Sequence, residues 1–194
     1  MRGPGDPFEE VRTWLDDARA SGLLGWDTAV VATATSDGRP SARAVLLRGF
    51  DDRGFVFFTD TRSRKGRELA ANPRAALVMT WPPLERQVRA EGLVEQVAGE
   101  ESDAYFARRP RGHQVGAWVS RQSEVLPDRH DLERRLDEVQ RQFDGRPVPR
   151  PPYWGGYRIV PHEIELWQGR PDRLHHRVRY QRSDDGWRAE LLWP

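Results

Sequence analysis

Basic side chains gather in one stretch of the chain, at positions where strands are expected to end. Arg43 and Arg48 bracket a first apolar run, and Ser63-Arg64-Lys65 follows a second one and starts a helical pattern. The start of a helix favours anions, as do arginine and lysine side chains. The stretch therefore predicts an anion site, and we expect the phosphate of a planar cofactor as its ligand. The alternative is a set of solvated surface charges, which describes most isolated arginines and lysines.

A second group of cationic and donor side chains follows residues 167–169. Arg173, His175 and Arg177 alternate, so on an extended strand they would share one face and suit an anionic, hydrogen-bonding ligand. The pair His175-His176 alone is typical of polar surface. The five histidines include no HExxH spacing, and the chain contains no GxSxG, GxGxxG or Walker loop. No metal site is expected.

Composition excludes several classes of protein. The 194 residues include 31 basic and 30 acidic ones, for a net charge of +1, which argues against a nucleic-acid partner held by bulk electrostatics. Cysteine is absent, which rules out disulfides, thiolate zinc sites and cysteine nucleophiles and fits a cytoplasmic protein. No apolar run approaches the roughly 18 residues of a membrane span, and residues 1–5 lack a signal-peptide core. We expect a single domain with no membrane partner.

Strands dominate the first half of the chain. Asp6-Pro7 is typical of a helix start, and Ser21-Gly22 ends that helix. The turn at 51–54 predicts a β-hairpin between the runs 43–50 and 55–59. The remaining elements expected here are strands at 28–35, 75–81 and 86–97, the last kinked near Gly92, and a short helix at 65–71.

The second half is expected to hold helices and then strands. Its predicted helical segments are 99–108, a turn at 114–118, and a charged helix at 128–143. Four prolines between 147 and 152 indicate an extended connector. The predicted strands are 157–160, 163–167, 177–181 and 187–192. Together the two halves predict a mainly β protein with helices, as a barrel or sandwich.

The sequence resembles the pyridoxamine/pyridoxine 5′-phosphate oxidases, FMN enzymes that make pyridoxal 5′-phosphate. The resemblance runs from about Asp6 to Pro194. It rests on the segments Arg43-Ala-Val-Leu-Leu, Phe-Phe-Thr59, Ser63-Arg-Lys-Gly66, Leu84-Glu-Arg-Gln-Val88, Tyr105-Phe, Arg109-Pro110, Gly116-Ala-Trp118, Ser120-Arg-Gln-Ser123, Tyr153-Trp-Gly-Gly-Tyr157, Glu165-Leu-Trp-Gln-Gly169 and Arg173-Leu-His175.

The resemblance implies an α+β fold, an FMN-binding split β-barrel flanked by helices. It implies one domain over 1–194, with an N-terminal helix within 1–22, the charged helix within 128–145, and C-terminal strands within 153–194. It also implies a homodimer with two FMN molecules at the interface, near which Trp118 and Trp167 would be buried. The residues implied to bind FMN, partly from the second subunit, are Arg43, Val45, Leu46, Phe58, Thr59, Arg64, Lys65, Gln87, Gln122, Ser123, Trp167 and Arg177.

The resemblance further implies a substrate and a reaction. Pyridoxamine or pyridoxine 5′-phosphate would be oxidised to pyridoxal 5′-phosphate, and dioxygen would become hydrogen peroxide. Arg173 and His175 would contact the substrate ring and its reacting carbon as catalytic residues. The residues implied to hold the substrate phosphate are Arg48, Tyr105, Arg109 and His113.

The chain departs from the family pattern at several points. Arg48 replaces a lysine, His113 replaces a serine, and His176 replaces an aspartate. The Arg-x-x-Tyr arm that folds over substrate in some relatives has no counterpart, because the first helix begins close to Met1.

Two other functions remain open. One is a flavin oxidase of the same fold that acts on another reduced ring, such as a dihydrophenazine. That enzyme would not need a substrate-phosphate cluster, so the retention of Arg48, Tyr105 and Arg109 weighs against it. The other is a module that carries FMN or pyridoxal phosphate without turnover.

Overall fold

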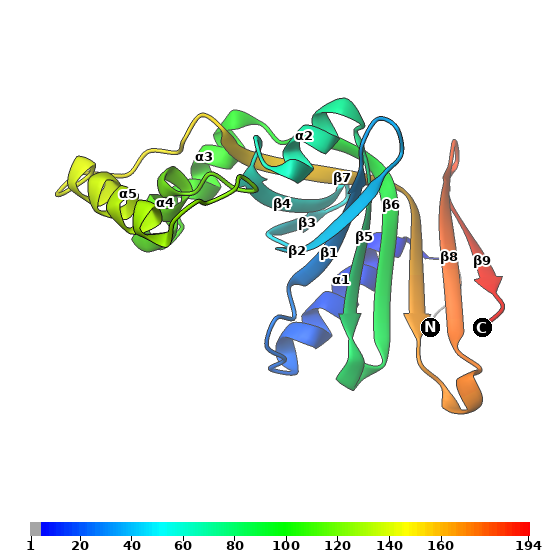
Figure 1. The fold of residues 1–194 in the computed structure, drawn as a ribbon. Coiled ribbons are helices and arrows are strands. Elements are labelled where there is room, and N and C mark those ends of the chain that lie inside the picture. The colour runs from blue at the N-terminus through cyan, green and yellow to red at the C-terminus, as the bar shows by residue number, and fades with distance from the viewer. Residues whose placement is uncertain (1–4) are drawn as a thin grey trace.

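A curled antiparallel sheet forms the centre of the computed structural model, which describes residues 5–194 (Figure 1). The expectations for residues 1–4, namely the absence of a signal peptide and the start of the 1–22 segment, lie outside the described residues. The strands are β1 (Thr28–Ala34), β2 (Pro40–Leu46), β3 (Gly49–Asp51), β4 (Gly54–Asp60), β5 (Arg74–Trp81), β6 (Arg86–Gln96), β7 (Trp154–Gln168), β8 (His176–Ser183) and β9 (Gly186–Leu192). Their order is β2-β1-β5-β6-β7-β4-β3, and β8 pairs with both β7 and β9.

The helices lie where sequence signals predicted them, within a few residues. The helix α4 is a full helix where only a turn at 114–118 was predicted. The elements are α1 (Pro7–Ala20), α2 (Arg64–Ala71), α3 (Gly99–Ala107), α4 (Arg111–Val119) and α5 (Arg129–Gln142), with short 3-10 turns η1 (Pro82–Leu84) and η2 (Pro171–Arg173). No helix in residues 5–194 has the length and apolarity that a membrane crossing requires.

Helix α1 closes the sheet on its concave side. The Asp6 side chain accepts a hydrogen bond from the Phe8 N–H, which caps the helix, and Pro7 occupies the first turn. The apolar side chains of α1 at helical spacing are buried, namely Phe8, Val11, Leu15 and Ala18, together with Trp14. They pack into the same core as the strand side chains. A second core joins α3, α4, α5 and Trp154 at the other end of the molecule (Figure 1).

The predicted hairpin between 43–50 and 55–59 is wrong in its first strand. The strand β2 pairs with β1, so Arg43 lies opposite Val31, and only the short β3 pairs with β4. The physical reason is the turn before β2, where Gly38 has a φ of +85° that favours a tight reversal onto β1. The chain leaves the sheet after Leu46, and Arg48 lies in the break between β2 and β3.

The long strand β7 corrects a second expectation, because the runs 157–160 and 163–167 form one strand. Pro161 lies between the two runs, at a bulge, where prolines are tolerated. Gly92 lies opposite Pro161 and Glu91 opposite Glu163, so His162 is the extra residue. A Cβ at Gly92 would lie 2.0 Å from the Val160 carbonyl oxygen, which explains the glycine at the predicted kink.

A buried cation ties β7 to three other elements. The Arg158 residue is 1% exposed, and its guanidinium pairs with Asp51 of β3, Glu95 of β6 and Glu101 of α3. A buried charge is tolerated when it is paired in this way. These ion pairs fix the first half of β7, which also pairs with β4.

Candidate functional site

The first cationic cluster lies where β4 ends and α2 begins. The Ser63 hydroxyl caps α2 by accepting from the Gly66 N–H at 3.3 Å. Lys65 is 7% exposed, and its Nζ donates to Thr59 Oγ1 at 2.9 Å and to Gln122 Oε1 at 2.7 Å. Burial and the nearby Arg43 lower the pKa of Lys65 to about 8. The two neutral acceptors only partly compensate the burial of this ammonium group, so the group is suited to bind an anion.

A buried carboxylate, Glu68, holds the two arginines of the same cluster. Its Oε1 accepts from Arg64 Nε at 2.8 Å, and its Oε2 accepts from Arg43 Nη2 at 3.3 Å. Burial alone would raise the pKa of Glu68, but hydrogen bonds from Ser41, Thr33 and Arg64 outweigh it and lower the pKa to about 2. Three cations and one anion leave this cluster with a positive charge. We call Arg43, Arg64, Lys65 and Glu68 the α2 cluster.

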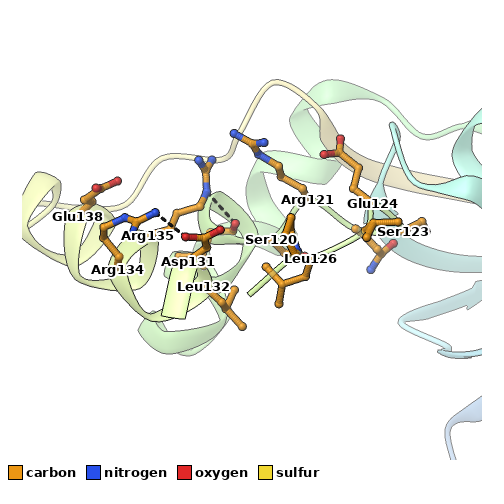
Figure 2. Close-up of a pocket in the computed structure, with 14 residues that line it drawn as sticks. Ser120, Arg121, Ser123, Glu124, Leu126, Asp131, Leu132, Arg134, Arg135 and Glu138 are labelled. Atoms are coloured by element: carbon orange, nitrogen blue, oxygen red, sulfur yellow. Dashed lines mark hydrogen bonds and ion pairs between the residues drawn. The ribbon is translucent and has the colours of Figure 1, made fainter. Parts of the chain in front are cut away.

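The segment 120–127 reaches the α2 cluster from the helical end of the molecule. Ser123 Oγ accepts from the Arg64 backbone N–H at 3.1 Å, and Ser123 has a φ of +74°. Gln122 and Ser123 also border a cavity of about 610 Å³ between this segment and α5 (Figure 2). Arg43, Arg64 and Lys65 do not line that cavity. The cavity therefore adjoins the cluster without containing it.

The second cationic cluster packs against a stack of aromatic rings. The Phe58 ring lies 4.1 Å from the Tyr105 ring and 5.3 Å from the Trp154 ring, both nearly parallel to it. The Arg109 guanidinium lies over Trp154, 4.6 Å from the ring centre. Arg109 Nη1 is buried and has no hydrogen-bond partner within residues 5–194. A buried donor of this kind is costly unless a ligand supplies an acceptor.

Arg48 belongs to the same neighbourhood. Burial lowers the pKa of Arg109, Tyr105 opposes that shift, and Arg48 lowers the pKa further through charge repulsion. Arg48 Nη1 itself donates to Asp27 Oδ2 at 2.6 Å. His113 lies on the exposed side of α4, and its side chain makes no hydrogen bond to the described residues around Arg109. The structure thus brings together three of the four residues predicted to hold the substrate phosphate, namely Arg48, Tyr105 and Arg109. The fourth, His113, is exposed and makes no hydrogen bond to them.

The third cluster lies across β6, β7 and β8. Gln87 pairs with Trp167, and Trp167 pairs with Arg177, so all three side chains share one face of the sheet. The His175 ring packs 4.5 Å from the Trp167 ring. His175 Nδ1 accepts from the Arg170 backbone N–H at 3.3 Å. A neutral His175 ring therefore carries its proton on Nε2.

The predicted single strand through 173, 175 and 177 is wrong. Strand β8 begins at His176, and Arg173 ends the 3-10 turn η2 with a φ of +60°. Asp172 also has a positive φ, and two such residues in succession turn the chain sharply. Only Arg177 of the three lies on the strand.

The predicted site residues form three separate clusters within one protomer. In Figure 1, helix α2 lies at the top of the sheet and the connection from β7 to β8 lies at its lower end, so the two are far apart. Leu46, on edge strand β2, is 45% exposed, and Val45 packs against the core.

Sequence reasoning missed two supporting residues of the first two clusters. Glu68 stands four residues after Arg64, a spacing that favours a helical ion pair and could have found it. Trp154 lies in the motif Tyr153-Trp-Gly-Gly-Tyr157, but a single tryptophan in a sequence does not show which arginine will lie over its ring.

The fold and the clusters define a class of protein, a split-barrel protein with cationic side chains grouped at several strand and helix ends. A family model described as pyridoxamine 5′-phosphate oxidase matches residues 15–143. A second, described as the pyridoxine 5′-phosphate oxidase C-terminal dimerisation region, matches residues 154–194. The chain belongs to the pyridoxamine 5′-phosphate oxidase family.

Named relatives agree with this family. A pyridoxine/pyridoxamine 5′-phosphate oxidase of Rubrobacter xylanophilus is 58% identical over 97% of this chain and 87% of its own length. One of Salinibacter ruber is 55% identical over 97% and 89%. Among solved structures, PhzG of Burkholderia lata 383 in complex with tetrahydrophenazine-1-carboxylic acid has a TM-score of 0.94. It is 35% identical and covers 99% of this chain and 94% of its own.

Proposed function

We propose that this chain oxidises pyridoxamine or pyridoxine 5′-phosphate to pyridoxal 5′-phosphate, with FMN as cofactor and dioxygen as oxidant, releasing hydrogen peroxide. The observation that supports a phosphorylated substrate concerns Arg109, which lies near Arg48 and Tyr105. Its buried Nη1 has no acceptor among residues 5–194. The α2 cluster provides a separate place for the cofactor phosphate. Two cationic clusters thus match two phosphorylated ligands.

The residues of the α2 cluster fit the phosphate of FMN. Arg64 uses its Nε for Glu68, and its side chain is 57% exposed, so its terminal nitrogens remain available. Lys65 stands at the start of α2 with a pKa near 8, and a phosphate dianion would compensate its burial. FMN, when bound, supplies the acceptor for the two electrons removed from the substrate.

Binding the substrate, orienting its ring and handling its proton would depend on this chain's own side chains. Arg48, Tyr105 and Arg109 would hold the substrate phosphate, and Arg173 and His175 would orient the ring and handle its proton. Because His175 Nδ1 accepts from the backbone, its Nε2–H is the group that can donate to the substrate. Gln87, Trp167 and Arg177 would complete the flavin site from the partner protomer.

Anaerobic bleaching tests the proposed function. Purified protein is expected to be yellow and to lose its flavin absorbance when pyridoxamine 5′-phosphate is added without oxygen. Admitting oxygen should restore the colour and release hydrogen peroxide. A flavin-loaded protein that no reduced ring bleaches would instead be a carrier module.

The likeness to PhzG supports a second candidate, an oxidase of a reduced phenazine. The bleaching assay separates the two when pyridoxamine 5′-phosphate, unphosphorylated pyridoxamine and a dihydrophenazine acid are compared at equal concentration. Bleaching by the phenazine and not by the phosphorylated amine would replace the proposed substrate. The cluster around Arg109 favours the phosphorylated amine.

FMN affinity is expected to fall as pH rises above about 8. Lys65 has a pKa of about 8 without ligand, and a bound dianion raises it, so binding takes up a proton between the two values. The dissociation constant should therefore increase by up to about tenfold per pH unit in that window. Flavin fluorescence from about pH 7 to 9.5 measures it. Riboflavin, which lacks the phosphate, is the control, and parallel profiles for both flavins would contradict the assignment of Lys65.

The protein is expected to sediment as a dimer of its 22.4 kDa chain. The C-terminal match is to a dimerisation region, and the third cluster lies far from the α2 cluster in one protomer (Figure 1), which supports a site completed by a second protomer. Half-buried Trp118 and Trp167 are expected to become more protected in that dimer. Sedimentation velocity with and without FMN measures the mass. A monomer that binds FMN tightly would contradict the two-chain site.

A further inference from the structure

We propose that Glu165 is a positioning residue for the flavin site, because it holds the Arg177 guanidinium in place. The inference rests on the proposed function, in which Arg177 contacts the flavin. It concerns a residue of the Glu165-Leu-Trp-Gln-Gly169 motif that no step of the proposed reaction uses.

The contact is a two-point ion pair between neighbouring strands. Arg177 Nε donates to Glu165 Oε1 at 2.8 Å, and Arg177 Nη2 donates to Oε2 at 3.1 Å. Arg89 Nη1 also donates to Oε2, at 3.2 Å. Two parallel bonds fix the plane of a guanidinium as well as its position.

The sheet register explains why Glu165 can do this. Glu165 lies directly opposite Arg89 on β6, and Trp167, two residues later, lies opposite Arg177 on β8. Residues two apart on a strand share a face, so Glu165 lies on the same face as Gln87, Trp167 and Arg177. Diagonal neighbours across a strand pair are within reach of long side chains.

Because Glu165 is buried, its carboxylate requires cationic partners. Glu165 is 5% exposed, and an ionised carboxylate at that depth requires cationic partners. Its hydrogen bonds, and then its charge, raise the pKa of Arg177 above the ordinary value. The third bond of Arg177 runs from Nη1 to the Trp193 carbonyl at 3.0 Å. Glu165 therefore binds the Nε–Nη2 edge of the Arg177 guanidinium, and further N–H groups of Arg177 can donate to a ligand.

A double-mutant cycle tests whether Glu165 acts through Arg177. FMN is titrated into ligand-free, full-length protein, and quenching of flavin fluorescence gives the dissociation constant. Glu165→Gln keeps the shape and removes the charge, and it is expected to raise the dissociation constant about tenfold. In an Arg177→Ala background the same change is expected to have almost no effect. Such non-additivity separates positioning from a general loss of structure.

Glu190→Gln is the matched control, because Glu190 pairs with Arg179 at 2.6 Å in the same region of sheet and touches no proposed flavin ligand. It is expected to leave FMN affinity unchanged. Additive effects of Glu165→Gln and Arg177→Ala, with FMN bound by the unaltered protein, would overturn the inference alone. Failure of the unaltered protein to bind FMN would overturn the proposed function together with it. If Glu165→Gln does not fold, Glu165→Asp, which keeps the charge and shortens the reach, takes its place in the cycle.

Discussion

A protein in which Arg64 and Lys65 are both replaced by alanine is expected to purify without colour. The α2 cluster would then keep only Arg43 as a cation, and Glu68 would remain beside it, so little positive charge would face a phosphate dianion. Each charge-assisted hydrogen bond contributes about 1.5–3 kcal/mol. The loss of two should weaken FMN binding by at least about a hundredfold. Absorbance of the purified protein and FMN titration measure the effect.

The matched control removes two arginines from the same neighbourhood. Arg67 on α2 and Arg74 at the start of β5 are exposed, and within residues 5–194 the Arg67 side chain donates a hydrogen bond only to the Arg62 carbonyl. The double variant Arg67→Ala/Arg74→Ala changes net charge equally and is expected to stay yellow. Full flavin retention in the Arg64/Lys65 variant would show that the cofactor phosphate lies elsewhere.

Replacing Arg109 by alanine is expected to raise the KM for pyridoxamine 5′-phosphate by about a hundredfold, because a buried charge partner of the phosphate is lost. FMN content should stay unchanged, since the α2 cluster is untouched. Turnover of unphosphorylated pyridoxamine, which lacks the phosphate that Arg109 would bind, should change little. Steady-state kinetics with both substrates measures the difference.

Arg108 provides the control for this second prediction. It precedes Arg109, is exposed, and its Nε donates to the Ala104 carbonyl within α3. Arg108→Ala is expected to leave both KM values unchanged. An equal loss for phosphorylated and unphosphorylated substrates in Arg109→Ala would mean that Arg109 supports the aromatic stack and does not read the phosphate.

The elements with local causes were predictable from the sequence. Asp6-Pro7, Ser63 and Asp128 each begin a helix by capping, which depends on a few neighbouring residues. The partner of a strand has no such local cause. The strand β2 turned back onto β1 through Gly38, and residues 157–167 remained one strand because Gly92 gave space for a bulge.

The candidate site was likewise predictable from the sequence only where its causes are local. The sequence could place Arg64 and Lys65 together at the start of a helix, and the structure adds that Gln122 and Ser123 reach them from a distant segment. The alternation of 173, 175 and 177 predicted one face of a strand, but Asp172 and Arg173 adopt left-handed backbone conformations that end the pattern. A positive φ at an arginine such as Arg173 is uncommon, and the residue type gives no sign of it.

The ion pairs around Arg158 have a consequence for the order in which the protein folds. Arg158 and Asp51 lie 107 positions apart, so a ribosome makes Asp51, Glu95 and Glu101 long before their shared counter-charge. Strand β4 waits for β7 as well, since its other neighbour in the described sheet is the three-residue β3. Pairing across such long loops is slow because the loop must close first. The nascent chain is therefore expected to expose the edges of β4 and β6 until β7 emerges, and during that interval it is most open to aggregation and to chaperones.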